Sequence, residues 1–120
     1  MPDHGFPVDV VGGVPVVVTP AEVDTTNAAA LRSALRTAAA DRPGTLIVDM
    51  TRTGFCDSSG PHALYAARQS AEAEGGQVLL VISSTLVRRI FALTGADRLI
   101  PTFTSLPEAL TRASGTVSTS

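Results

Sequence analysis

The sequence has few of the residues that build disulfide-linked or aromatic cores. It contains one cysteine, Cys56, no tryptophan, and aromatic residues at 4% of its 120 positions. One cysteine can form no intrachain disulfide, and it cannot by itself supply paired thiolate ligands for a metal ion. We therefore expect a protein of a reducing compartment that holds no metal and builds its core from aliphatic side chains.

Basic charge and long apolar runs are also scarce. The chain has 9 Lys and Arg residues against 11 Asp and Glu residues, so its formal net charge is -2. This balance provides no basic surface for the phosphates of nucleic acid or for anionic lipids. No run reaches the ~20 apolar residues that cross a bilayer, and residues 1–10 lack a basic start followed by an apolar core. We expect a cytoplasmic protein without direct contact to nucleic acid or membrane.

What the sequence does have is enough apolar residues for one well-filled core. Apolar residues make up 44% of the chain and charged residues 17%. A chain of this length is most simply folded as one domain, because two domains would each have an undersized core. We expect that domain to cover residues 8–113, with flexible ends at residues 1–7 and 114–120.

The first part of the domain has the pattern of a β-hairpin. Two β-branched runs, residues 8–11 and 14–19, flank Gly12 and Gly13, which readily adopt the positive φ angles of a tight turn. Pro15 has no N–H for a ladder hydrogen bond. We therefore expect Pro15 at a sheet edge or before regular pairing begins.

Apolar strands then alternate with amphipathic helices. The predicted strands are residues 45–50, 77–83 and 99–103, and the predicted helical segments are residues 28–40, 61–75, 84–95 and 105–113. The first two of these strands are apolar almost throughout, as in strands buried on both faces. The alternation predicts an α/β fold, a single domain with a mixed, largely parallel sheet of about five strands covered by about four helices.

A polar loop follows the predicted central strand at residues 45–50. Asp57, Ser58, Ser59 and Gly60 lie between that strand and the next helix, and functional sites of α/β sheets gather at the carboxyl ends of strands. These side chains either cap the helix, as Asp and Ser commonly do, or present a hydroxyl group to a partner. The residues by themselves leave both interpretations open.

Several separated segments together resemble one family. FCDSSG follows LIVDM, and GGQVLLV, VRRIFALTGADRLIPTF and SLPEAL come after it in order, while VVVTPAEVDTTNAAALRSAL precedes it. Over residues 8–113 this succession resembles the STAS-domain family of anti-sigma-factor antagonists. The resemblance implies a STAS-like fold for the single domain.

The resemblance also implies a function and a site. In that family an unphosphorylated antagonist binds an anti-sigma factor that is also a serine protein kinase, which releases a sigma factor. Phosphorylation of the second serine of DSSG, Ser59 here, reverses the binding, and a serine phosphatase would reset it. Asp57, Ser58 and Gly60 match the positions that flank the phosphoacceptor in the partner-binding loop. Asp24 matches an acidic position with a supporting role in docking or phosphoryl transfer, beside its alternative role as a helix cap.

Other functions have less support from the residues. Ser58 and Ser59 do not stand in G-x-S-x-G, and neither His4 nor His62 offers an ordered general base, so we expect no enzymatic activity. No G-x-G-x-x-G follows a strand, so we expect no dinucleotide or other cofactor. Cys56 beside the loop raises the hypothesis of a redox sensor, although a buried thiol is commonly inert. A STAS module that binds proteins or a small ligand in another signalling assembly, without a dedicated kinase, remains the alternative.

Overall fold

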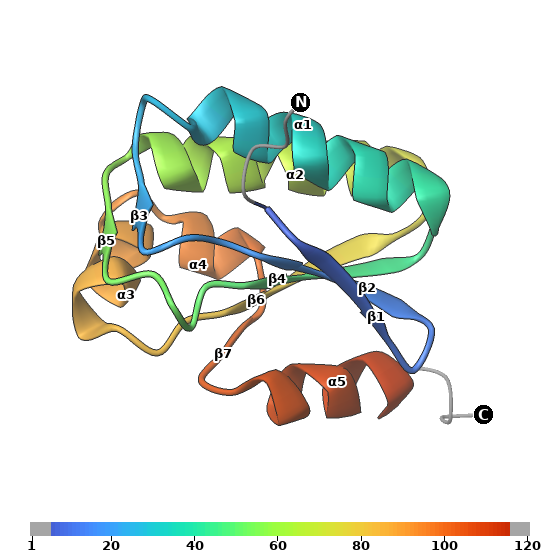
Figure 1. The fold of residues 1–120 in the computed structure, drawn as a ribbon. Helices are drawn as coiled ribbons and strands as arrows, with labels where there is room; N and C mark the ends of the chain where they lie inside the picture. The colour runs from blue at the N-terminus through green and yellow to red at the C-terminus, as the bar shows by residue number, and fades with distance from the viewer. Residues whose placement is uncertain (1–5, 116–120) are drawn as a thin grey trace.

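A computed structural model of the protein describes residues 6–115 and is built around a five-stranded sheet (Figure 1). Its strands are β1 (Val8–Val11), β2 (Val14–Val18), β4 (Thr45–Asp49), β6 (Gln77–Val81) and β7 (Thr102–Phe103). They lie in the order β1-β2-β4-β6-β7, in which β1 pairs antiparallel with β2 and every other neighbouring pair is parallel. The predicted mixed, largely parallel sheet is confirmed, and β4 lies at its centre.

Helices cover both faces of this sheet, with α1 and α2 on one face and α5 on the other (Figure 1). They are α1 (Ala28–Asp41), α2 (Ser59–Ala73), α3 (Thr85–Leu93), α4 (Ala96–Leu99) and α5 (Leu106–Gly115). The four longer helices overlap the segments predicted to be helical, whereas the single-turn α4 has no counterpart in the expectation. Helix α2 begins two residues earlier than predicted, so Ser59 and Gly60, expected in the loop, belong to the first turn of the helix. Gly95, with a φ angle of 80°, follows α3 and stands directly before α4, so one helix ends and another begins at the same glycine.

Alternating side chains of the central strands point into two separate cores. Leu46 and Val48 of β4 belong to the larger core, between the sheet and helices α1 to α4, and Ile47 belongs to the smaller core against α5. Strand β6 repeats the alternation, with Leu80 in the larger core and Leu79 in the smaller one. Each of these five side chains is at most 1% exposed. A strand buried on both faces has to be apolar throughout, which accounts for the two uninterrupted apolar runs of the sequence.

A two-residue turn joins β1 to β2 at the edge of the sheet. Gly12 and Gly13 have positive φ angles of 58° and 83° in this turn. Two consecutive positive φ angles are what a hairpin turn of this length favours, because they match the twist of the strands. The predicted hairpin is confirmed.

Pro15 lies in β2 at a position where its missing N–H removes no ladder bond. The carbonyl of Pro7 accepts a hydrogen bond from Val18 N at 3.0 Å, and alternation along the antiparallel pair then leaves Pro15 without a bond to β1. On its other side, β2 pairs with β4 only from Val16 onward. The expectation that Pro15 precedes regular pairing is confirmed for the β4 side.

The N-terminal end of the described chain packs onto the domain. Phe6 is 9% exposed and belongs to the larger core, and the carbonyl of Pro7 bonds to β2. The expected flexible segment at residues 1–7 is therefore wrong for these two residues, because a single buried aromatic side chain has no periodic pattern that would reveal it. The last helix, α5, likewise continues beyond the expected domain end at residue 113. The expected flexible residues 1–5 and 116–120 lie outside the described residues.

Candidate functional site at the start of α2

Two short strands outside the main sheet bring the predicted site residues to one place. They are β3 (Glu22–Val23) and β5 (Phe55–Cys56), which run parallel to each other. Val23 pairs with Cys56, and the backbone N–H of Asp57 donates to the carbonyl of Val23 at 3.2 Å. Asp24 and Asp57 therefore each follow directly on a paired residue, at the same end of two parallel strands. Gly60 in the first turn of α2 lies against both paired residues, Val23 and Cys56, and Figure 1 shows β3 and β5 running side by side near the start of α2.

Buried threonine hydroxyls attach the loop before β5 to the segment after β2. Thr19 and Thr53 are each 1% exposed, and their Oγ1 atoms lie 2.6 Å apart. Thr53 Oγ1 also donates to the carbonyl of Pro20 at 2.6 Å, and Gly54 N donates to the carbonyl of Ala21 at 2.9 Å. Two isolated threonines far apart in the chain form no pattern from which this contact could be predicted.

The hydroxyl group of Ser59 is held by Asp57. One carboxylate oxygen, Asp57 Oδ1, accepts hydrogen bonds from the backbone N–H of Ser59 at 2.9 Å and from its hydroxyl at 2.5 Å. Ser59 is half-buried and is the first residue of α2, where backbone N–H groups have no partner within the helix. The two bonds fix the direction of the Ser59 side chain and engage its hydroxyl proton, so that the lone pairs of the oxygen point away from the carboxylate.

The helix-capping interpretation of the loop is confirmed for one residue, Asp57. Asp57 caps the start of α2 through the N–H of Ser59, whereas Ser58, which stands at the N-cap position, makes no side-chain capping bond. The side chain of Ser58 is exposed, and Gly60 is buried. The helix start is thus stabilised by the aspartate, while Ser58 is exposed in the loop and Ser59 is half-buried in the first turn of the helix.

Asp24 has a local partner of its own. Its Oδ1 atom accepts hydrogen bonds from the hydroxyl of Thr26 at 2.5 Å and from the backbone N–H of Thr26 at 2.9 Å. These bonds, first from the hydroxyl and then from the N–H, hold the pKa of Asp24 below its ordinary value. The N-cap residue of α1 is Asn27, so the suggested helix-capping role of Asp24 is replaced by stabilisation of the turn that precedes the helix.

Gly60 and Cys56 lie in close contact beneath the loop. A Cβ atom at position 60 would overlap the Sγ atom of Cys56 and would also touch Val23. Cys56 is 2% exposed, and its Sγ donates to the carbonyl of Asp57 at 3.2 Å. Burial, followed by the charge of Asp57, raises the pKa of this thiol to about 11. The thiol therefore stays protonated near neutral pH, which argues against the redox hypothesis.

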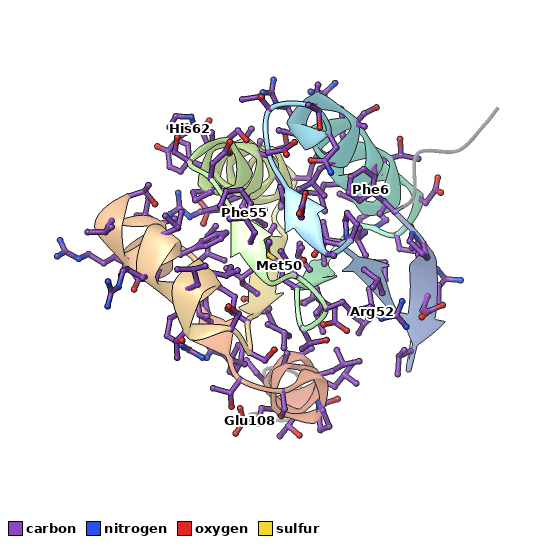
Figure 2. All side chains as sticks on the ribbon, turned by 60° about the vertical axis from the view of Figure 1, so that its left-hand side comes forward. Phe6, Met50, Arg52, Phe55, His62 and Glu108 are labelled. Carbon is purple, nitrogen blue, oxygen red and sulfur yellow. The ribbon has the colours of Figure 1, made fainter. Side chains whose placement is uncertain are left out.

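Exposed apolar side chains lie near the loop, on the side of α3. Phe55 of β5 is 46% exposed, and Leu86 in the first turn of α3 is 54% exposed. Helix α3 packs against β5, and Figure 2 shows Phe55 between α2 and α3 with His62 beyond it on α2. Arg88 donates to the carbonyl of Ile82 at 3.0 Å and so packs back onto the chain. The surface around the loop is therefore partly apolar.

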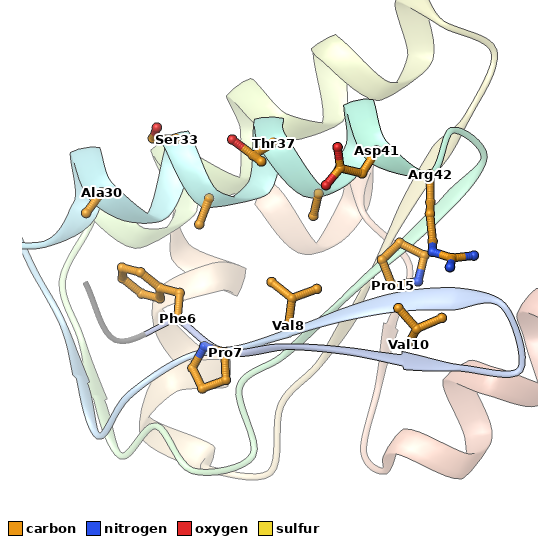
Figure 3. Close-up of a pocket in the computed structure, with 12 residues that line it drawn as sticks. Phe6, Pro7, Val8, Val10, Pro15, Ala30, Ser33, Thr37, Asp41 and Arg42 are labelled. Carbon is orange, nitrogen blue, oxygen red and sulfur yellow. The ribbon is translucent and has the colours of Figure 1, made fainter. Parts of the chain in front are cut away.

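A cavity of about 650 Å³ lies elsewhere, between the β1–β2 hairpin and α1. Phe6, Val8 and Val10 line one side of it, and residues of α1 such as Thr37 line the other (Figure 3). None of the predicted site residues lines this cavity. The candidate site therefore lies apart from this cavity.

The carboxylates near the loop act as hydrogen-bond acceptors. Asp24 accepts a hydrogen bond from the hydroxyl group of Thr26, and Asp57 accepts one from the hydroxyl group of Ser59. Within residues 6–115, no group of three or more His, Cys, Asp or Glu side chains could hold a metal ion. In the same part of the chain, no helix has both the length and the hydropathy needed to cross a bilayer.

Comparison with known protein families gives a match over nearly the whole described domain. The sequence profile of the STAS domain family matches residues 6–109. The chain belongs to the STAS domain family. The match of this STAS domain begins at Phe6, the residue that packs into the larger core, and it ends within α5.

The STAS domain described here is similar to proteins that antagonise anti-sigma factors. It is 32% identical over 103 residues to the anti-sigma-F factor antagonist RsfB of Mycobacterium tuberculosis, and the match covers 86% of this chain and 84% of RsfB. A crystal structure of an anti-sigma factor antagonist from Mycobacterium paratuberculosis has a TM-score of 0.82 at 32% identity, covering 90% of this chain and 92% of the other. The unphosphorylated form of the anti-sigma factor antagonist SpoIIAA has a TM-score of 0.78 at 26% identity, covering 92% and 97%. The family resemblance and the fold class are confirmed.

Proposed function

We propose that this STAS protein is an anti-sigma-factor antagonist controlled by phosphorylation of Ser59. In its unphosphorylated form it binds an anti-sigma factor that is also a serine protein kinase, and the sigma factor held by that partner is released. Phosphate on Ser59 ends the binding, and a serine phosphatase restores it. The observation that carries the proposal is the ordered hydroxyl of Ser59, the first residue of α2, which is held by Asp57 of the loop that joins β5 to α2.

The position of Ser59 accounts for a change in binding without unfolding. A phosphate carries about -1.5 to -2 charges at neutral pH, and here it would face the Asp57 carboxylate that accepts the Ser59 hydroxyl. A partner covering the loop would have to bury two repelling anions, which weakens the complex. The first N–H groups of a helix favour an anion by about 0.3–1 kcal/mol, so the folded domain tolerates the phosphate.

The proposed docking surface combines the loop with the apolar side chains near it. It comprises Asp24, Asp57, Ser58, Ser59 and Gly60, with Phe55 and Leu86 at its border. Both are exposed, and aromatic side chains such as Phe55 are enriched in protein interfaces. Gly60 contributes by allowing the start of α2 to lie against β5.

In this proposal the protein is a kinase substrate and a binding partner, and it catalyses no reaction of its own. The phosphate comes from ATP bound by the kinase, so this chain needs no cofactor. The Ser59 hydroxyl donates to Asp57 and not to a histidine, which differs from the arrangement of a serine hydrolase. The cycle requires ATP, the kinase and the sigma factor in one compartment, the cytoplasm.

Phosphorylation by candidate kinases tests the proposal. The purified protein is incubated with ATP and with each anti-sigma kinase encoded in the same genome, and any phosphate is located by mass spectrometry. We expect one phosphate on Ser59 of the wild type and none on Ser59→Ala. Ser70→Ala, a change at an exposed serine of the same helix, is the matched control and should be phosphorylated like the wild type.

Binding to the same kinase is the second measurement. Isothermal titration calorimetry with ADP present should show that wild type and Ser59→Ala bind, and that the phosphorylated protein binds at least about tenfold more weakly. No phosphate from any candidate, or phosphate on another residue, would contradict the proposal. Such a result would favour a STAS module that binds its partner constitutively.

A further inference from the structure

One edge of the main sheet carries open backbone groups that the proposed function does not use. In the described sheet β1 is an outer strand, and its neighbour is β2. The carbonyl of Pro7 accepts a hydrogen bond from Val18 N, and the bonded pairs of an antiparallel ladder alternate from that point. The N–H and C=O groups of Val8 and Val10 therefore face away from β2. An edge with such groups is a template for a further strand.

An apolar groove runs along the same strand, between β1 and α1. Its volume is about 650 Å³. Val8 and Val10 point from β1 toward α1, and they are 46% and 48% exposed (Figure 3). On the helix the lining extends from Ala30 to Asp41, which is about 16 Å of helix or the length of about five residues of extended chain. The groove can therefore receive alternate side chains of an extended segment that lies beside β1.

The opposite face of β1 carries an unpaired negative charge. Asp9 stands across from Val16 of the smaller core, so its side chain lies on the α5 side of the sheet. Its carboxylate is exposed and forms no salt bridge with residues 6–115. In an antiparallel strand bonded to Val8 and Val10, the residue across from Asp9 belongs to a non-hydrogen-bonded pair, in which side chains lie closest. A lysine or arginine at that position would meet the carboxylate.

We propose that β1 docks an extended segment of a partner protein by antiparallel strand addition, at a place separate from the Ser59 loop. The segment has an apolar–basic–apolar pattern, in which the apolar side chains enter the groove and the basic side chain meets Asp9. Its backbone takes up the hydrogen bonds that Val8 and Val10 leave open. A small apolar ligand would fill the groove alone, whereas an extended segment uses the groove, the backbone groups and the charge.

Three short synthetic peptides, capped at both ends, test the proposal. In the first, one arginine stands between two valines, with a serine at each end. The second has the same sequence with methylated valine amides, which removes the donors to β1 and keeps the side chains and the charge. The third has glutamate in place of arginine. Binding to the isotope-labelled full chain is followed by the chemical shifts of its amides at millimolar peptide concentrations.

We expect the first peptide to shift the amides of Val8, Asp9 and Val10 in a saturable way. The methylated peptide should bind at least about tenfold more weakly, because the bonds between the strands are lost. The glutamate peptide should bind the wild type at least about threefold more weakly than the arginine peptide, because like charges across a strand pair repel.

A charge reversal in the protein should reverse this preference. Asp9→Arg should bind the glutamate peptide more tightly than the arginine peptide. Asp97→Arg is the matched control, because it changes the net charge equally at an exposed aspartate of α4, and it should keep the wild-type preference. Circular dichroism melting curves establish that both variants are folded.

Three results would overturn the inference. Unshifted amides along β1 would show that the edge takes no strand of this pattern. Equal binding of the methylated peptide would show that the groove holds apolar side chains without strand pairing. Sedimentation of the protein alone as a dimer that the first peptide does not dissociate, with β1 amides protected from exchange, would assign the edge to a second copy. These measurements need no kinase, so the proposed function stands or fails separately.

Discussion

The contact between Gly60 and Cys56 shows how the lack of one side chain determines the position of another. Gly60 lies in α2 without a positive φ angle, yet the place where its Cβ would stand is filled by the sulfur of Cys56. The start of α2 can therefore lie against β5 only when residue 60 is glycine. Ser59 is the residue directly before this contact, so its distance from β5 depends on Gly60.

Gly60→Ala should destabilise the protein and displace the start of α2. Alanine normally stabilises a helix interior by about 1 kcal/mol relative to glycine. Here its methyl group would overlap a buried sulfur, and overpacking of that kind costs about 1–3 kcal/mol. We expect a lower free energy of unfolding in urea titrations and slower phosphorylation of Ser59.

A second glycine of the same region provides the control for this prediction. Gly54 also lacks a positive φ angle, and a Cβ atom there would meet nothing within 4 Å. Gly54→Ala should therefore change the free energy of unfolding by no more than about 0.5 kcal/mol. The double change Gly60→Ala with Cys56→Ala should recover part of the lost stability, because it removes the overlapping sulfur. Equal stability of Gly60→Ala and wild type would show that the close approach does not constrain the loop.

At the scale of the structural elements, the site depends on the connection between the segments that lead into β3 and β5. Thr53 donates to the carbonyl of Pro20, so the Thr19 hydroxyl is the donor to Thr53 at 2.6 Å. Both hydroxyls are buried, and removal of one leaves polar groups without a partner. The two threonines thus hold together the segments whose ends carry Asp24 and Asp57.

Thr53→Val should loosen this connection while preserving the shape of the side chain. The change removes the donor to Pro20 and the acceptor for Thr19, and a buried polar group left unpaired costs about 1–3 kcal/mol. We expect a matching decrease in the free energy of unfolding in urea. We also expect faster hydrogen exchange at the Gly54 amide, which donates to the carbonyl of Ala21.

Thr51→Val is the matched control, since Thr51 is exposed in the same loop and its hydroxyl is not part of the buried contact. Its stability and its exchange rates should match those of the wild type. If Thr53→Val also matched the wild type, the threonine contact would have no role in holding β3 and β5 together.

The length of an element decided in most cases whether its sequence could predict it, the exception being the two-residue strand β7, which lies within the predicted strand at residues 99–103. The longer strands β4 and β6 and the helices α1, α2, α3 and α5 repeat apolar residues at a strand or helix period, and the sequence predicts all of them. The two-residue strands β3 and β5 and the single turn α4 are too short for any period. They form because contacts with other parts of the chain hold their backbones in place. The residues of each short segment give no sign of those contacts.

The sequence predicts which residues form the candidate site, but it does not predict the contacts that they make. The position after a central strand, together with the resemblance to a known family, identifies Asp57, Ser58, Ser59 and Gly60. Neither observation indicates that Asp57 Oδ1 accepts two bonds from Ser59, or that Gly60 touches Cys56. These contacts join residues only two and four positions apart, so they depend on the exact backbone conformation of the turn into α2, which the residue pattern does not specify.

At the scale of the whole molecule, the N-terminal end of the described chain closes the larger core. Phe6 precedes the first strand, yet it packs with residues of β2, α1 and α2 in one cluster. A small domain has little buried surface to spare, so one aromatic side chain contributes a sizeable part of its stability. The folded unit therefore begins before the first strand.

Phe6→Ala should lower the free energy of unfolding by about 3 kcal/mol, as other truncations of buried phenylalanine do. Phe55→Ala is the matched control, because Phe55 is 46% exposed, and it should cost less than about 1 kcal/mol. Urea titration at constant pH measures both. Equal effects of the two changes would mean that Phe6 does not belong to the cooperative core.

The edge of the sheet bears on how copies of the molecule behave at high concentration. Along β1, the backbone groups of Val8 and Val10 face away from β2, and all four residues of the strand are exposed. Such an edge is a template for pairing with another strand. Antiparallel pairing of two copies that placed Val8 opposite Val10 would set the Asp9 carboxylates directly against each other, and like charges in that position repel. In this register, the one charged side chain of β1 therefore opposes pairing of the strand with its own copy.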